Sequence, residues 1–129
     1  MLARARNRYR AVDNISAVTD RSPIELILLV YDRIADKLNA AEAAIASQRD
    51  DLLAESITEA TDLISLGLLA ALDYQLGGAI AENLGAIYDY AMRRLLQARL
   101  RRDVVMVREI ADLLAGLREA WVNVQQTQV

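Results

Sequence analysis

The stretch SPIELILLVYDRIADKLNAAEAAI, residues 22–45, decides the fold. It opens with the signature of a helix N-terminus: Ser22 can cap the helix, Pro23 suits its first position, and Glu25 can reach back to complete a capping box. Apolar residues then recur in alternating steps of four and three, at Ile27, Tyr31, Ile34, Leu38, Ala41 and Ile45. This spacing predicts a helix over residues 23–48 with one apolar stripe along it.

Three further segments carry the same period, and we expect helices over residues 51–72, 79–101 and 104–125. Residues 73–78, which include the turn signal Gly77-Gly78, form the expected break before the third helix, and the stripe of that helix places Ile80 inward. Asp103 can cap the last helix. Short connections make neighbouring helices antiparallel, so the predicted fold is all-α, an antiparallel up-down four-helix bundle. We expect an N-terminal arm at residues 1–21, the bundle at residues 22–125 and a frayed C-terminal tail at residues 126–129.

The apolar stripes also predict the core of the bundle. The residues expected to be buried are Ile27, Ile34, Leu38, Ile64, Leu84, Ile87, Leu95, Ile110, Leu113 and Leu117. Trp121 lies beside the last stripe, where a tryptophan usually anchors a core.

Composition excludes most catalytic chemistry. The 129 residues include no cysteine and no histidine, which excludes disulfides, thiolate zinc sites, cysteine nucleophiles and Ser-His-Asp triads. Acidic pairs one turn apart, such as Asp32 with Asp36, are typical of solvated helix faces. We therefore expect no enzyme activity, no catalytic residue, no metal site and no cofactor.

Charge and hydropathy narrow the possible partners. The net charge is −3, although Arg4, Arg6, Arg8 and Arg10 make the first residues basic. An acidic chain is a poor candidate for nucleic-acid binding. No uncharged run exceeds ten residues, whereas a membrane-spanning helix needs about 20. We expect neither membrane insertion nor a signal peptide.

Two segments carry more apolar residues than a bundle buries. Residues 24–31 are apolar on nearly every side of the helix, and residues 63–72 repeat the pattern. Either other helix ends and the N-terminal arm cover this surface, or it forms a groove that receives a partner segment, most simply a helix. The two interpretations are compatible if the N-terminal arm covers the groove until a partner displaces it.

The sequence resembles a known family along essentially its whole length. Residues 77–84, GGAIAENL, and 87–96, IYDYAMRRLL, resemble the third-helix signature of the flagellar secretion chaperone family, FliS. The stretches at 22–32, 102–103 and 117–121 are similar to the family's first helix and to the two ends of its last helix. Tyr9 followed by Val12 resembles its N-terminal tyrosine segment. The sequence departs from the family pattern at Arg33, Ala91 and Arg99.

The resemblance implies a bacterial cytoplasmic chaperone. Such a protein binds the disordered C-terminal segment of flagellin, which becomes helical along the hydrophobic surface of the bundle. Binding prevents premature polymerisation and assists delivery to the flagellar type III export apparatus, where an export-gate protein is a candidate second partner. The N-terminal segment is expected to cover part of the same surface when flagellin is absent.

These observations select candidate partner-binding residues: Tyr9, Ile24, Leu28, Tyr31, Leu66, Leu69, Tyr88, Tyr90, Arg93 and Arg94. Tyr88 and Tyr90 are two positions apart, so one can lie in the core while the other faces outward. The expected oligomeric state is a monomer or a weak dimer. The alternative function is a structural helical bundle that self-associates through the same apolar surface.

Overall fold

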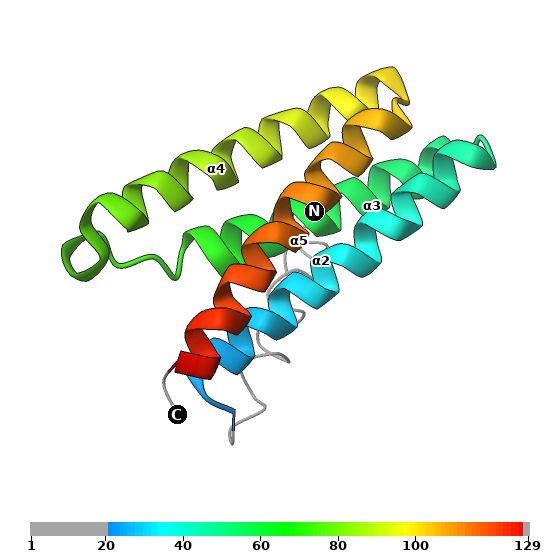
Figure 1. The fold of residues 1–129 in the computed structure, drawn as a ribbon. Helices are drawn as coiled ribbons and strands as arrows, with labels where there is room; N and C mark the ends of the chain where they lie inside the picture. The colour runs from blue at the N-terminus through cyan, green and yellow to red at the C-terminus, as the bar shows by residue number, and fades with distance from the viewer. Residues whose placement is uncertain (1–20, 128–129) are drawn as a thin grey trace, which may run out of the picture.

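The computed structural model describes residues 21–127. Its helices are α2 (Pro23–Ala46), α3 (Asp50–Asp62), which continues as the π-helix η1 (Leu63–Leu69), α4 (Tyr74–Arg101) and α5 (Val104–Thr127). Residues 21–127 contain no strand, and the predicted four-helix bundle is confirmed (Figure 1). Most of the predicted N-terminal arm, including Tyr9, lies outside the described residues.

Two predicted caps begin their helices. The Ser22 hydroxyl oxygen accepts a hydrogen bond from the Glu25 backbone N–H at 3.2 Å, and Pro23 occupies the first helical position. Asp103 accepts from the Val105 N–H at 2.9 Å at the start of α5. Because these caps satisfy otherwise unpaired N–H groups, they fix where α2 and α5 begin.

The second and third helices depart from the prediction. The single helix expected over residues 51–72 changes into the π-helix η1, in which the Ala70 N–H donates to the Ser65 carbonyl five residues back at 3.0 Å. α4 begins at Tyr74 rather than residue 79, because Asp73 caps an additional turn. The predicted Gly77-Gly78 turn survives as a break at Gly78, where φ is 53° and ψ is −125°.

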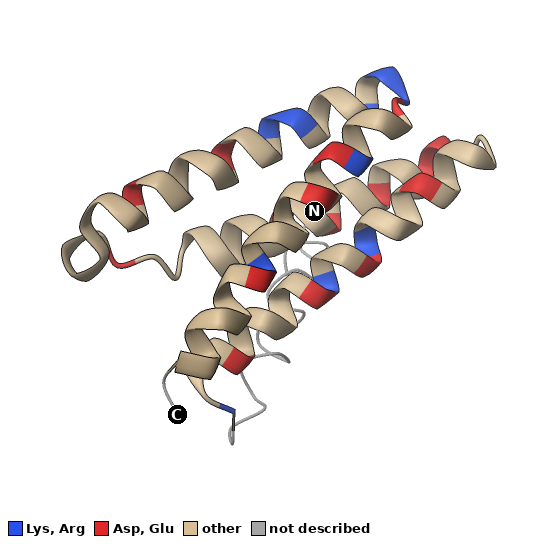
Figure 2. Cartoon of the chain, in the orientation of Figure 1, with Lys and Arg blue, Asp and Glu red and all other residues tan. Residues whose placement is uncertain are grey.

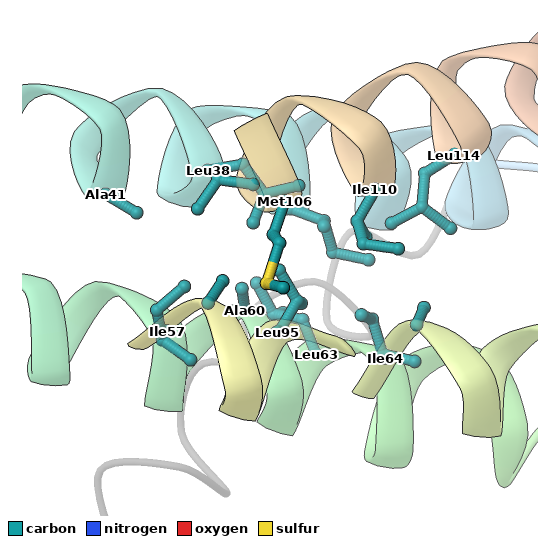
Figure 3. Packing of buried hydrophobic residues seen from close by; sticks show 14 of the residues in the cluster. Leu38, Ala41, Ile57, Ala60, Leu63, Ile64, Leu95, Met106, Ile110 and Leu114 are labelled. Atoms are coloured by element: carbon teal, nitrogen blue, oxygen red, sulfur yellow. The ribbon is translucent and has the colours of Figure 1, made fainter. Parts of the chain in front are cut away.

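The core combines residues from every helix (Figure 3). The predicted burial of Ile34, Leu38, Ile64, Leu95 and Ile110 is confirmed. The predicted burial of the other five was wrong, since Ile27, Leu84, Ile87, Leu113 and Leu117 are only partly buried.

α4 turns a different face to the core than expected. That face consists mostly of small residues with two larger ones: Ala81, Gly85, Tyr88, Ala91, Leu95 and Ala98. Ile80, placed inward by the sequence pattern, is 71% exposed. Small side chains let the α4 backbone approach its neighbours closely, and the large aliphatic residues are displaced to its flanks.

Acidic and basic residues are distributed along the α-helices (Figure 2), and several of them form ion pairs between helices. Asp32 and Glu42 of α2 pair with Arg118 and Arg108 of α5 at 2.7 and 2.6 Å. Arg102 pairs with Asp50 at 2.6 Å. Exposed pairs of this kind contribute little free energy each, so the buried apolar residues supply most of the stability.

Candidate partner-binding groove

The bundle carries an open groove of about 710 Å³. It lies where the first part of α4 diverges from α5 (Figure 1). We call it the main groove; it is lined by Ile27, Gly67, Leu68, Ala71, Leu72, Asp73, Leu76, Gly77, Ile80, Ala81, Leu84, Tyr88 and Trp121. Among the described lining residues Asp73 is the only charged one, and the Asp73 carboxylate is already occupied as the cap of α4.

The floor and the rim of the main groove differ in burial. Leu68, Ala81 and Tyr88 form a buried floor that belongs to the bundle core. At the rim, Leu76 is 88% exposed and Ile80 is 71% exposed. A large aliphatic pair left in water beside an apolar hollow is a typical feature of a protein-binding surface.

Gly67 of η1 keeps the wall of the groove close to α2. A Cβ built on Gly67 would lie 2.9 Å from Cγ1 of Val30. Any larger residue at this position would push η1 away from α2. The glycine thus sets the spacing between η1, which carries part of the groove, and α2.

Beneath the groove lies a buried polar pair. The hydroxyl oxygens of Tyr31 and Tyr88 are 2.6 Å apart, and both rings are buried. Burial raises the pKa of Tyr31 far above its usual value, and the hydrogen bond with Tyr88 raises it further. Burial also raises the pKa of Tyr88, although its contacts with Tyr31 and Trp121 oppose the shift. Both hydroxyls therefore stay neutral, and they present no charge to the groove.

The chain segment that supplies most of the groove lining, η1 and the first part of α4, carries no basic residue. Residues 63–92 contain no lysine or arginine, and the arginines of α4 lie in its second half (Figure 2). There Arg94 donates to Glu109 at 2.9 Å, and the Tyr90 hydroxyl donates to the same carboxylate. These two donors, Tyr90 first, lower the pKa of Glu109. Within α4, the basic side chains that could attract an anionic partner therefore lie toward its C-terminal end.

A smaller hollow of about 370 Å³ lies between α3 and α4. Its lining includes more charged and hydroxyl-bearing residues than that of the main groove and consists of Ile57, Thr58, Thr61, Asp62, Met92, Arg93, Leu96 and Arg99. Within residues 21–127, no group of three or more acidic residues is placed to hold a metal ion. No helix in that range is long and apolar enough to span a membrane.

Comparison with known proteins identifies the family. The family model described as "Flagellar protein FliS" matches residues 5–128. This chain belongs to the FliS family. It is 40% identical over 115 residues to the flagellar secretion chaperone FliS of Salmonella typhimurium, covering 88% of this chain and 84% of that protein. The FliS of Escherichia coli is 31% identical over 119 residues, covering 92% and 88%. The FliS of Bacillus subtilis is 28% identical over 124 residues, covering 95% and 89%.

The FliS match includes every helix and the whole main groove. The resemblance inferred from residues 22–32, 77–96, 102–103 and 117–121 is therefore confirmed. As a member of the FliS family, the chain is a flagellar secretion chaperone by family, and its partners are to be sought among flagellar export substrates.

The candidate residues chosen from the sequence are dispersed over this FliS-family bundle. Leu28, Tyr31 and Tyr88 are buried, whereas Ile24, Leu66, Leu69 and Arg94 are partly buried and Tyr90 and Arg93 are exposed. Of these, Tyr88 lines the main groove and Arg93 lines the smaller hollow. Tyr90 and Arg94 meet at Glu109. Tyr9 is outside the described residues.

Sequence reasoning missed the rim of the groove. Leu76 was assigned to a break between helices, and Ile80 was assigned to the core. One available signal was the position of these two residues, four apart and on either side of Gly77-Gly78. Large aliphatic residues next to a turn are available to a partner even where the helical period suggests burial.

Proposed function

We propose that this FliS-family protein is a bacterial cytoplasmic export chaperone that binds the disordered C-terminal segment of flagellin in the main groove. Binding keeps the subunit from polymerising early and assists its delivery to the flagellar type III export apparatus, with an export-gate protein as a further partner. The observation that carries the proposal is an apolar groove, with no basic residue among its described lining residues, whose rim exposes Leu76 and Ile80.

The groove suits an amphipathic segment that folds on binding. Leucines and isoleucines of the client can enter the groove at helical spacing, while the polar side of the client stays in water. Ordering a disordered segment consumes part of the binding free energy, which leaves a complex that can be released at the export apparatus. Because the client's apolar residues are then covered, they are no longer available for contacts between flagellin subunits.

The experiment is a calorimetric titration of a flagellin C-terminal peptide onto the full chain. Wild type should bind one peptide, and a peptide of the same composition in scrambled order should not bind. Since the groove carries no basic residue, affinity should change little between low and moderate salt. A thousandfold loss of affinity over that range would instead indicate an electrostatic mechanism.

A matched pair of variants tests whether the peptide lies in the main groove. Leu84 and Leu113 are both partly buried against the core, but only Leu84 lines the groove. Leu84→Ala should weaken binding about tenfold, the loss expected for much of a leucine contact. Leu113→Ala should stay within about twofold of wild type. Equal losses in both variants would mean that they act through the fold and not through the groove.

The alternative of a self-associating structural bundle gives a different result. In that case the chain forms a dimer through the main groove, and the peptide neither binds nor dissociates the dimer. Analytical ultracentrifugation with and without peptide separates the two functions. A chaperone should change from a monomer or weak dimer to a complex of one chain with one peptide.

A further inference from the structure

The turn that precedes Gly78 is a separate structural unit at the rim of the main groove. The Asp73 carboxylate accepts hydrogen bonds from the backbone N–H groups of Gln75 and Leu76, both at 3.0 Å. The Gly77 N–H donates to the Asp73 carbonyl at 2.8 Å. We call residues 73–77 the jaw. Asp73 thus satisfies three of the jaw's backbone N–H groups from within the segment, which favours a jaw that keeps its shape if it changes position.

Gly78 connects the jaw to the rest of α4. Its φ of 53° and ψ of −125° form a combination that glycine adopts readily and other residues avoid. A Cβ built on Gly78 would have no heavy atom within 4 Å. The backbone conformation, and not crowding by a neighbouring side chain, therefore demands glycine here.

Only slight contacts hold the jaw against α4. A Cβ on Gly85 would lie 2.9 Å from the Tyr74 hydroxyl, so the missing side chain leaves room for that ring. Gly77 likewise lies against Ala81, with 2.8 Å between their Cβ positions. Tyr74 is nevertheless 51% exposed and Leu76 is 88% exposed. A segment that buries so little apolar surface opens at low free-energy cost.

Leu76 on the jaw and Ile80, two residues after Gly78, both line the main groove. We propose that the jaw turns about Gly78 and closes on the bound client, and that Leu76 is a specificity-determining contact. The inference rests on the proposed function, since the occupant is the flagellin segment already assigned to this groove. With no lysine or arginine in residues 63–92 to attract an acidic side chain, the client residue beneath Leu76 is aliphatic or aromatic.

The proposed contact between Leu76 and the client is tested with two exposed leucines of α4, of which only Leu76 lines the main groove. Leu100 is 70% exposed and lines none of the hollows described here, which makes it the control for Leu76. Leu76→Ala should weaken binding of the flagellin C-terminal peptide about tenfold, because the truncated side chain loses most of the apolar contact that Leu76 gains when the peptide covers it. Leu100→Ala should remain within about twofold of wild type. Equal affinities of the two variants overturn the proposal, whereas failure of wild type to bind the peptide overturns the proposed function itself.

The movement is tested by fixing the jaw with a disulfide. The chain contains no cysteine, so Gly77→Cys combined with Ala81→Cys introduces a single reversible cross-link. The cross-link requires the two Cβ atoms, at 2.8 Å, to separate by about 1 Å. The oxidised variant should bind the peptide about fivefold or more weakly than the same variant after reduction, because the closed position is no longer populated. The single-cysteine variants should not respond to oxidant at low protein concentration. Equal or tighter binding in the oxidised state means that the jaw is a fixed wall.

Discussion

Tyr31 of α2 and Tyr88 of α4 bring their hydroxyl oxygens to 2.6 Å from each other inside the apolar core. Tyr31 is 3% exposed and Tyr88 is 1% exposed, so both hydroxyls are shielded from water, and Trp121 also contacts them. The pair joins two helices that are distant in sequence, and Tyr88 also forms part of the groove floor. The stability of the bundle and the shape of the groove therefore share one polar contact.

Removing both of these hydroxyls should cost less than the sum of the losses from removing each one alone. Tyr31→Phe or Tyr88→Phe leaves a buried hydroxyl without that partner, which costs about 1–3 kcal/mol. The double variant should lose less than the sum of the two single variants, because neither hydroxyl is left behind. Urea unfolding of the four proteins gives the coupling free energy directly. Additive losses would show that the hydroxyls do not depend on each other.

The same pair predicts a loss of stability at alkaline pH. In the unfolded chain tyrosines ionise near pH 10, whereas burial raises the pKa values of Tyr31 and Tyr88 in the folded protein. A raised folded-state pKa means that the stabilisation is complete below about pH 10 and decreases as the pH rises above that value. The free energy of unfolding should therefore decrease with pH above about 10.

The control for this pH dependence is the double phenylalanine variant. Its free energy of unfolding should decrease less steeply with pH. Part of the slope should remain, because the hydrogen bond to Glu109 also raises the pKa of Tyr90. A slope identical to that of wild type would contradict a role for the buried pair.

Gly67 should not tolerate a side chain. In Gly67→Ala the new Cβ would meet Cγ1 of Val30 at 2.9 Å, and valine in a helix has little rotamer freedom to move away. We expect a loss of about 1–3 kcal/mol from overpacking. Gly116→Ala is the matched control, because a Cβ there has open space and alanine is the better helix former by about 1 kcal/mol.

A second substitution decides whether Val30 is the cause. Val30→Ala should restore part of the stability lost in Gly67→Ala. As a single variant it should be destabilising, because it removes apolar contacts of Val30 with the core. Thermal unfolding of the single and double variants measures this rescue. If Gly67→Ala is as stable as Gly116→Ala, η1 and α2 are not as tightly spaced as the structure indicates.

The helices could be predicted because their signals are local. Ser22 and Asp103 act on N–H groups two or three residues away, and the apolar period is a property of each segment alone. The π-helix η1 could not be predicted in this way, because its extra residue per turn is maintained by packing against other helices. The break at Gly78 was visible as a glycine pair, but Asp73 placed a helical turn before it.

The choice of core face needed information from other helices. α4 has large aliphatic residues on one side and small residues beside them, and the pattern favoured Ile80 and Ile87 over Ala81 and Tyr88. Close packing of the backbones selected the smaller set. The position of the groove also depends on other helices. The excess of apolar residues predicted that a groove exists, but its location at the jaw follows from how α4 and α5 diverge.

The register of α5 gives the last prediction. The sequence pattern placed Leu113 in the core, but Leu114 is 4% exposed and Leu113 is only partly buried. Leu114→Ala should therefore lower the free energy of unfolding by about 2–5 kcal/mol, since it removes buried methyl groups and leaves a cavity. Leu113→Ala should cost about half as much, because part of its side chain is already in water.

Both variants have the same chemistry, helix and helix propensity, so the comparison isolates burial. Urea unfolding should give similar slopes for the two and a lower midpoint for Leu114→Ala. A larger loss in Leu113→Ala than in Leu114→Ala would mean that the buried stripe of α5 lies one residue earlier, which is a rotation of about 100° around the helix. That rotation would also carry Trp121 away from the main groove, which Trp121 lines here. The stability of two neighbouring leucine variants thus tests the wall of the groove as well as the core.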